Sequence, residues 1–581
     1  MRIARGMRCR GRYALIGLAV ALLATGRAWA QGALEPDVVF VNGKIITLDG
    51  AGRIVEAVAA RDGRIVAVGT NREIRALAGQ STRVIDVQGR TVIPGFYDNH
   101  AHLGTGRDPS IQEWDHISSW EELAAALRAR AREVPEGEWI QAHLSTERLP
   151  EQVLPTRREL DRVVPNHPVA LHRMHVMLVN SLALEKAGIT RDTPDPRGGR
   201  IDRDERGEPN GILREQPAHR LVERVIPEWQ PDPESAEQTL RNQLRHLASL
   251  GITSVNVPGV RPHVLPRLQK VYERWGDELP RVTVQIRISP GFDMYDDPEE
   301  GIRTELGYIE GLRFYTGFGN DRIKLGAIKM SVDGGMTGQA AWLIDPYKHD
   351  PDFHGVVRIP PEVLYAVGRR AHDLGWQLGI HAIGDAAVQA AVDVLDRILT
   401  ESPRDDHRHY LHHIEVKPPE ATLDKMARHG IIAAMQPNFT YSLAPYVENA
   451  LAQEKLGSVN PQKELIERGI RISFGSDGLP LGPLVGIYAA VTRKGINGVV
   501  YGPDQRIGVL DALRYYTLGS AYMTFDEDER GSIEVGKYAD MTVLSGDILT
   551  IDPERILDLQ ALMTVVGGEV IYQADGRTTS N

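Results

Sequence analysis

Two histidines with a spacing of two, His100 and His102, follow an apolar run in the segment VIPGFYDNHAH at 92–102. Successive side chains of a strand point to opposite faces, so residues two apart point the same way. Two imidazoles that converge make half of a metal site, and imidazole suits zinc, iron, nickel and copper. A pair of surface histidines in a loop would show the same pattern, so a metal site requires further ligands.

Four more residues of ligand or base type lie at or just after other apolar runs: Lys329 in AIKMSVDGG, His381 in GIHAIGD, His413 in HYLHHIEV and Asp477 in FGSDG. A lysine that points into a protein interior is costly unless its charge is removed or paired. Carboxylation by CO₂ would turn it into an anionic ligand that bridges two metals. His412 and His413 should point to opposite faces of their strand, so we expect only one of them, His413, in the site. Asp477 could instead cap the following helix, and His407 and His409 are expected at the surface.

These candidates share a position relative to the predicted strands. Eight strand-like runs, most separated by helix-length segments, follow one another at 92–98, 251–259, 281–289, 323–332, 377–384, 409–416, 430–437 and 471–478. Such an alternation predicts a (β/α)₈ TIM-type barrel, whose active site lies at the carboxyl ends of its strands. The candidate ligands come at those ends, which favours a catalytic metal centre.

Regions outside the eight repeats predict further domains. Short β-type runs with hairpin turns occupy 37–93, and similar runs return at 527–575, so we expect one composite β-sandwich built from both chain ends. The barrel would span 94–526. Because the interval between its first two strands is too long, an inserted α/β subdomain is expected at 103–250.

The first thirty residues predict export. Basic residues precede an apolar stretch from Ala14 to Leu23, and Ala28-Trp29-Ala30 resembles a cleavage site, so 1–30 is interpreted as a signal peptide. The apolar stretch is too short to span a bilayer comfortably. Cleavage removes six arginines and no acidic residue, which takes the net charge from −11 to −17, and also removes the only cysteine, Cys9. We therefore expect a periplasmic or secreted protein without membrane or nucleic-acid partners.

The motifs resemble those of the amidohydrolase superfamily, in the branch called amidohydrolase family 3, which includes enzymes similar to N-substituted formamide deformylase. The resemblance covers essentially the whole mature chain. It rests on NGKIITLD, PGFYDNHAH, HVMLVNSLALEKAGI at 175–189, the segment at 192–215, HAIGDAAV, FGSDG and GSIEVGKYADMTVL. Two departures are VDGGMTGQAAW after Lys329, which leaves the substrate open, and HHIEV where an Ile-Glu-His order is expected, which leaves His412 as an alternative to His413.

The resemblance implies a centre of one or two divalent ions, zinc by preference, held by His100, His102, Lys329, His381, His413 and Asp477. In that centre Lys329 would be an N6-carboxylysine bridge, and Asp477 would contact the first metal and move protons. The substrate would be contacted by His175, Asn180, Glu215 and Asp333. His175 could instead only pack the insert on the barrel, and Glu215 could be a solvated helix residue.

The reaction that fits these residues is hydrolysis of a non-peptide C–N bond, in an amide or N-substituted formamide, by a water that the metal activates. A mononuclear deaminase and a cyclic amidohydrolase are alternatives with the same chemistry. An exported binding protein without activity is a more distant one, since all six candidate positions are filled. The expected partner is a small amide-type molecule, and a homodimer is one open arrangement.

Overall fold

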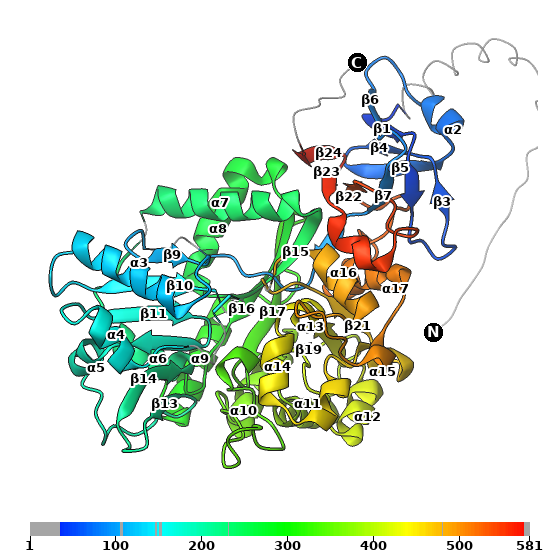
Figure 1. Cartoon of the computed structure of the whole chain (residues 1–581). Coiled ribbons are helices and arrows are strands. Elements are labelled where there is room, and N and C mark those ends of the chain that lie inside the picture. Colours follow the sequence, from blue (N-terminus) through cyan, green and yellow to red (C-terminus); the bar gives the residue numbers. More distant parts are fainter. Residues whose placement is uncertain are drawn as a thin grey trace, which may run out of the picture.

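The computed structural model describes residues 35–104, 108–145, 148–149, 154–230, 232–478 and 480–574 (Figure 1). The predicted signal peptide and Cys9 lie outside these residues. Within them, no helix combines the length and the apolar character that a membrane crossing requires.

Eight parallel strands form the central sheet, in the order β21-β20-β19-β18-β17-β16-β15-β8. Their bounds are β8 Phe96–Asp98, β15 Ile252–Val260, β16 Arg281–Arg287, β17 Ile323–Ser331, β18 Leu378–Ala382, β19 Tyr410–His413, β20 Ile432–Met435 and β21 Ile472–Phe474. Each lies within or overlaps one of the predicted runs. The sheet is nearly closed where Asn99 N donates to Phe474 O at 3.1 Å. The predicted TIM-type barrel is therefore confirmed.

Helices cover the outside of this barrel, as the alternating pattern predicts. The main ones are α7 Pro233–Ser249, α8 Leu265–Trp275, α9 Pro298–Leu312, α10 Pro361–Asp373, α11 Asp385–Glu401, α12 Glu420–His429 and α16 Pro483–Thr492. Shorter helices are α13 Asn438–Ser442, α14 Ala444–Ala450, α15 Gln462–Glu467, α17 Val509–Arg514 and α18 Ser520–Met523. Their apolar faces and the outward side chains of the strands form one core.

A separate sheet follows the first barrel strand, in the order β13-β14-β12-β11-β10-β9. Its strands are β9 Gln112–Trp114, β10 Ile140–Leu144, β11 Val169–Arg173, β12 Val176–Val179, β13 Arg200–Arg203 and β14 Pro209–Arg214. Helices α3 Trp120–Glu133, α4 Arg157–Val163, α5 Ser181–Lys186 and α6 Glu215–Glu223 accompany it. This insert projects from the side of the barrel opposite residues 35–94 and 541–574 (Figure 1). Helix α7, by contrast, contacts α8 and β15 and belongs to the barrel's outer layer.

Two further sheets form the sandwich; the first contains N-terminal strands alone, and the second combines strands from both ends of the chain, shown in blue and red in Figure 1. One has the order β5-β4-β1-β6 and the other β24-β23-β22-β7-β2-β3. The strands are β1 Val38–Val41, β2 Lys44–Ile46, β3 Ile54–Val55, β4 Ala57–Arg61, β5 Arg64–Gly69, β6 Arg83–Asp86, β7 Thr91–Pro94, β22 Met541–Leu544, β23 Ala561–Val566 and β24 Glu569–Gln573. Their apolar side chains share one core. The buried ion pair between Arg281 Nε and Asp540 Oδ2, at 2.8 Å, joins these sheets to the barrel.

His407 and His409 are buried, so the expectation that they lie at the surface is wrong. His409 shares a hydrogen bond with His372 at 2.9 Å between their ring nitrogens, and its other nitrogen accepts from Leu378 N at 3.0 Å. The second nitrogen of His372 donates to Ser402 O at 2.8 Å. The polar sequence around these histidines suggested that they are exposed, but the tertiary structure supplies a hydrogen-bond partner for each of these ring nitrogens.

Candidate metal centre

The loops that follow the first and the last barrel strand are hydrogen-bonded to each other. Asp477 N donates to His100 O at 2.7 Å. The buried carboxylate of Asp98 accepts from the backbone N of both His100 and Ser476, each at 3.0 Å. Gly475 has no side chain to obstruct this approach, because a Cβ there would lie 2.6 Å from His100 N. These contacts hold His100 and Asp477 side by side at the carboxyl end of the barrel.

His100, His102 and Asp477 form a group of potential metal ligands whose donor atoms all lie within 4.8 Å of one another. Asp477 Oδ1 is 3.3 Å from His102 Nε2 and 3.6 Å from His100 Nε2, and the two Nε2 atoms are 3.4 Å apart. Two imidazole nitrogens and one carboxylate oxygen are a donor set that suits zinc and other first-row divalent ions. The three residues therefore fit a divalent cation.

A second group lies next to the first. The rings of His381 and His413 are 4.4 Å apart, and His413 Nδ1 is 4.0 Å from Asp477 Oδ2. His381 Nε2 and His413 Nδ1 are buried and have no hydrogen-bond partner in the described structure. Lys329 is buried and makes no ion pair with any described residue. Buried polar atoms are rarely left unpaired, so these nitrogens fit ligation of a cation.

The charge states of these groups suit metal binding. Burial lowers the pKa of His413 to about 3, and it lowers the pKa of His100 and His381 well below the usual value. Neutral imidazole is the form that ligates. Burial works against ionisation of Asp477, but the hydrogen bond and charge of His102 hold the pKa of Asp477 at about 2. Burial and neighbouring arginines lower the pKa of Lys329 despite the charge of Asp477.

His412 and His413 both lie inside the barrel, so the expectation that only one of them points inward is wrong. The ring of His100 is 4.3 Å from the ring of His412 and 5.0 Å from that of His413. The backbone explains this, because His413 and Ile414 have positive φ angles of 79° and 52°, and strand alternation ends there. His413 approaches Asp477 and His381, whereas His412 is hydrogen-bonded to His100.

The insert brings His175 and Glu215 together at the edge of the barrel. His175 Nδ1 is 2.8 Å from Glu215 Oε1, which also accepts from Gly335 N at 3.1 Å. Glu215 Oε2 lies 3.8 Å from the guanidinium of Arg358. Burial lowers the pKa of His175, but the Glu215 carboxylate outweighs it and the pKa is raised. Glu215 is therefore not a solvated helix residue, and the pair anchors the insert to the loop after β17.

Asn180 and Asp333, two predicted substrate contacts, have their side chains engaged by the backbone. Asn180 caps α5, accepting from Ala183 N at 3.0 Å, and also donates to His167 O at 2.8 Å. Asp333 accepts from three backbone N–H groups, including Gly384 N at 2.9 Å, although its Oδ1 lies 3.4 Å from His381 Nε2. Asn180 thus has a structural role within the insert, and Asp333 holds the turn that carries His381.

The sequence profile described as the amidohydrolase family matches residues 83–572, which include the barrel, the insert and the sandwich strands from β6 onward. The chain belongs to this amidohydrolase family. The predicted resemblance is confirmed.

Similar proteins cover nearly the same length. YtcJ of Bacillus subtilis (strain 168), an amidohydrolase by name, is 30% identical over 560 residues, which cover 92% of this amidohydrolase and 99% of YtcJ. N-substituted formamide deformylase of Arthrobacter pascens is 28% identical over 554 residues, 93% and 99% of the two chains. The crystal structure of an uncharacterized metal-dependent hydrolase from Pyrococcus horikoshii OT3 superposes with a TM-score of 0.66 and 25% identity, covering 89% of this chain and 99% of that one. The chain is thus, in general terms, a metal-dependent hydrolase.

Sequence reasoning missed two residues of β16 that face the site of this amidohydrolase. Gln285 and Arg287 continue an alternation of polar and apolar residues along β16, which also contains Arg281 and Thr283. Gln285 Oε1 is 3.0 Å from His412 Nε2, and Arg287 is the register partner of Lys329 in the neighbouring strand. Their spacing was a usable signal, because inward positions of a barrel strand alternate.

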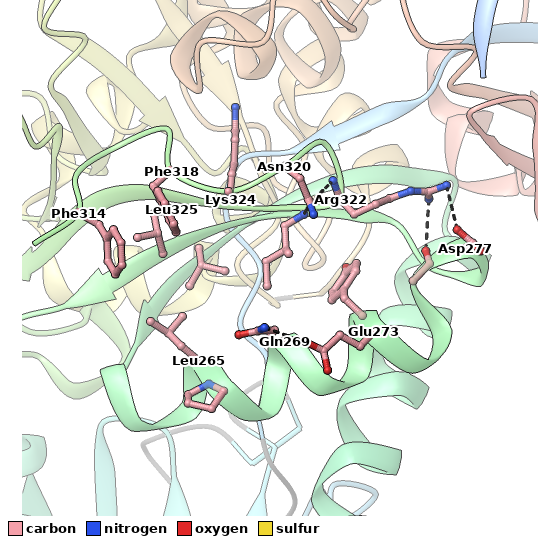
Figure 2. A pocket seen from close by; sticks show the side chains of 16 residues that line it. Leu265, Gln269, Glu273, Asp277, Phe314, Phe318, Asn320, Arg322, Lys324 and Leu325 are labelled. Carbon is pink, nitrogen blue, oxygen red and sulfur yellow. Dashed lines mark hydrogen bonds and ion pairs between the residues drawn. The ribbon is translucent and has the colours of Figure 1, made fainter. Parts of the chain in front are cut away.

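A large cavity of this amidohydrolase, about 550 Å³, lies elsewhere, on the outer flank of the barrel (Figure 2). It is lined by apolar residues of α8, β16 and β17 and by the segment that carries Phe314 and Phe318. Figure 2 shows Arg322 at its edge, bound to neighbouring groups, and Lys324 pointing away. None of the candidate ligands described above lines it, so this cavity is not the catalytic site.

Proposed function

We propose that this amidohydrolase hydrolyses the C–N bond of a small non-peptide amide, with N-substituted formamides as the first class to test. The observation that carries the proposal is the convergence of His100, His102 and Asp477 at the mouth of the barrel. The formamide class is suggested by the similarity to the deformylase of Arthrobacter pascens. The proposed cofactor is zinc or a similar divalent ion.

The chain's own residues have defined tasks in this reaction. The histidines and Asp477 would hold a divalent cation, which would supply a Lewis acid for activating water and polarising the carbonyl. Asp477, ionised and next to His102, accepts a proton from the attacking water at a carboxylate oxygen. The oxygen of the water forms the new bond to the carbonyl carbon while the C–N bond breaks. Asp477 then delivers its proton to the leaving nitrogen.

Lys329 has the surroundings that a carboxylated lysine requires. It is buried at the centre of the sheet, beside Arg287, and pairs with no described carboxylate. Addition of its neutral amine to CO₂ would give a carbamate and release one proton. The carbamate would supply anionic oxygen ligands near His381 and His413 and would balance the positive charge of Arg287.

The proposal is tested by metal analysis and product analysis of the purified full chain. About two equivalents of zinc, reduced in Lys329→Ala but not in the exposed control Lys348→Ala, would support a two-metal centre. A panel of N-alkyl and N-aryl formamides, acetamides and cyclic amides would then be assayed for acid and amine release. Absence of bound metal after reconstitution would refute the proposal.

A mononuclear deaminase is the second candidate, and one observation favours it. The three donor atoms of His100, His102 and Asp477 already form a compact set without Lys329. Such an enzyme would bind about one equivalent of metal, would be indifferent to Lys329→Ala, and would release ammonia without an acid. Measuring ammonia against carboxylic acid in the same reactions separates the two candidates.

A further inference from the structure

We propose that His412 and Gln285 are positioning residues, which keep a proton on Nδ1 of His100 and so leave Nε2 of His100 free to bind the metal. The proposal rests on the metal centre proposed above. Neither residue is among the proposed metal ligands. His412 contacts His100 directly, and Gln285 contacts His412.

The three side chains form a continuous hydrogen-bonded chain. His100 Nδ1 lies 2.8 Å from His412 Nδ1, and His412 Nε2 lies 3.0 Å from Gln285 Oε1. All three residues are at most 1% exposed, so bulk water does not compete for these bonds. At the other side of the ring, His100 Nε2 faces His102 and Asp477.

This arrangement permits only one direction of donation if His100 binds a metal. Two ring nitrogens 2.8 Å apart share a single proton, so one donates and the other accepts. Gln285 presents its carbonyl oxygen, which accepts and therefore requires the proton of His412 on Nε2. His412 Nδ1 must then accept, and His100 must donate from Nδ1. The remaining nitrogen of His100, Nε2, keeps its lone pair for the metal.

The opposite direction of hydrogen-bond donation would prevent His100 from binding the metal. A proton on His412 Nδ1 would make His100 Nδ1 an acceptor and would place the single ring N–H proton of neutral His100 on Nε2. That proton would face Asp477 and occupy the ligand position. Partners that fix the tautomer of a ligating histidine in this way commonly change metal affinity by about 10- to 100-fold when they are removed.

The surrounding barrel is shaped to hold these residues. The ring of Tyr410 stands at 89° to that of His412, with 4.9 Å between their centroids. Gly379 on β18 leaves the space for Gln285, because a Cβ there would lie 2.8 Å from Gln285 Oε1 and 2.7 Å from the Tyr410 ring. The positive φ of His413 turns the following residue without displacing His412 from the interior.

The test measures zinc affinity of the full-length protein by competition with a chromogenic chelator at neutral pH. His412→Leu removes the acceptor, and we expect zinc to bind about 10- to 100-fold more weakly. His412→Gln is the matched variant, since its amide oxygen can accept from His100 and its amide nitrogen can donate to Gln285. Affinity within about threefold of the unmodified protein is expected for it.

A second pair keeps the proposal testable if His412→Leu fails to fold. Gln285→Glu retains the acceptor and should preserve affinity, whereas Gln285→Leu should weaken it. Thermal melting of each metal-free variant shows whether a loss of affinity merely follows a loss of fold. Equal zinc affinity of all folded variants would overturn the proposal. Absence of zinc binding by the unmodified protein would instead refute the proposed function.

Discussion

Nε2 of His102 lies 3.3 Å from Oδ1 of Asp477, and this contact joins the loop after the first barrel strand to the loop after the last. The two residues differ in exposure, with 53% of the His102 side chain accessible but only 17% of Asp477. His100, on the far side of the same group, is buried. Asp477 lies between the solvent-facing His102 and the buried His100, so we expect a substrate to approach the candidate centre from the side of His102.

Replacing Asp477 by Asn should lower kcat by about 10²- to 10⁴-fold, because the amide cannot accept and return the proton. The histidines should still retain bound metal. The control is Asp424→Asn, an exposed residue of α12 that should leave kcat unchanged. Steady-state assays and metal analysis check both points. Loss of metal from Asp477→Asn would show instead that the carboxylate acts chiefly as a ligand.

Loss of the His175–Glu215 pair should lower turnover without changing the amount of bound metal. His175→Gln removes the imidazole that contacts the ionised Glu215 carboxylate, and hydrogen bonds to charged groups contribute about 1.5–3 kcal/mol. We therefore expect kcat/KM to fall about 10- to 100-fold at unchanged metal content. His246→Gln on the exposed face of α7 is the matched control. Full activity of His175→Gln would assign the pair a purely structural role in docking the insert.

Gly475 should tolerate no side chain. A Cβ would lie 2.3 Å from Asn99 Oδ1 and 2.6 Å from His100 N, and the second of these is backbone that cannot rotate away. Gly475→Ala should cost about 1–3 kcal/mol of unfolding free energy and weaken metal binding, because His100 moves. Gly307→Ala in α9, where nothing lies within 4 Å of the added carbon, should be neutral or slightly stabilising. Equal denaturation midpoints for the two variants would contradict this.

The buried cluster of His372, His407 and His409 predicts loss of stability in acid. Burial lowers the pKa of each of these imidazoles in the folded chain, whereas the unfolded chain protonates them below about pH 6.5. Above about pH 6.5 these histidines are neutral in both states, so they make no pH-dependent contribution to the unfolding free energy. Below that pH the unfolded state binds more protons than the folded state. The unfolding free energy should therefore decrease as the pH falls below that value, by at most about 1.4 kcal/mol per pH unit for each histidine.

Urea unfolding of metal-free protein between about pH 7.5 and about pH 5 measures this dependence. His372→Gln keeps a donor for Ser402 O but cannot titrate, so it should show a shallower slope than the unmodified chain. His246→Gln, exposed on α7, should keep the full slope. Identical slopes for His372→Gln and the unmodified chain would refute the assignment.

Local patterning was enough to predict the barrel. Most strands of the sheet lie in runs rich in apolar residues, and most of these runs are followed by residues with helical spacing. That information is carried by neighbouring positions, because strand and helix periodicities need only a few residues to be recognised. The positions of His100, His102, Lys329, His381 and Asp477 relative to these runs likewise predicted that they lie at or near the carboxyl ends of strands.

What the sequence could not decide depends on contacts between distant segments. Alternation placed His412 outside the barrel, but a positive φ at His413 ends the strand geometry and leaves both rings inside. Asn180 has a side chain that could bind a substrate, but its amide oxygen accepts from Ala183 N at the start of α5 and its amide nitrogen donates to His167 O. The pairing of His175 with Glu215, and of His412 with Gln285, exists only once the insert and the barrel strands pack. Sequence thus determined the helices, the strands and the chemical types of the residues at their ends. Tertiary structure decided which of these side chains contact one another, because packing, and not the neighbouring sequence, sets the partners of a buried polar group.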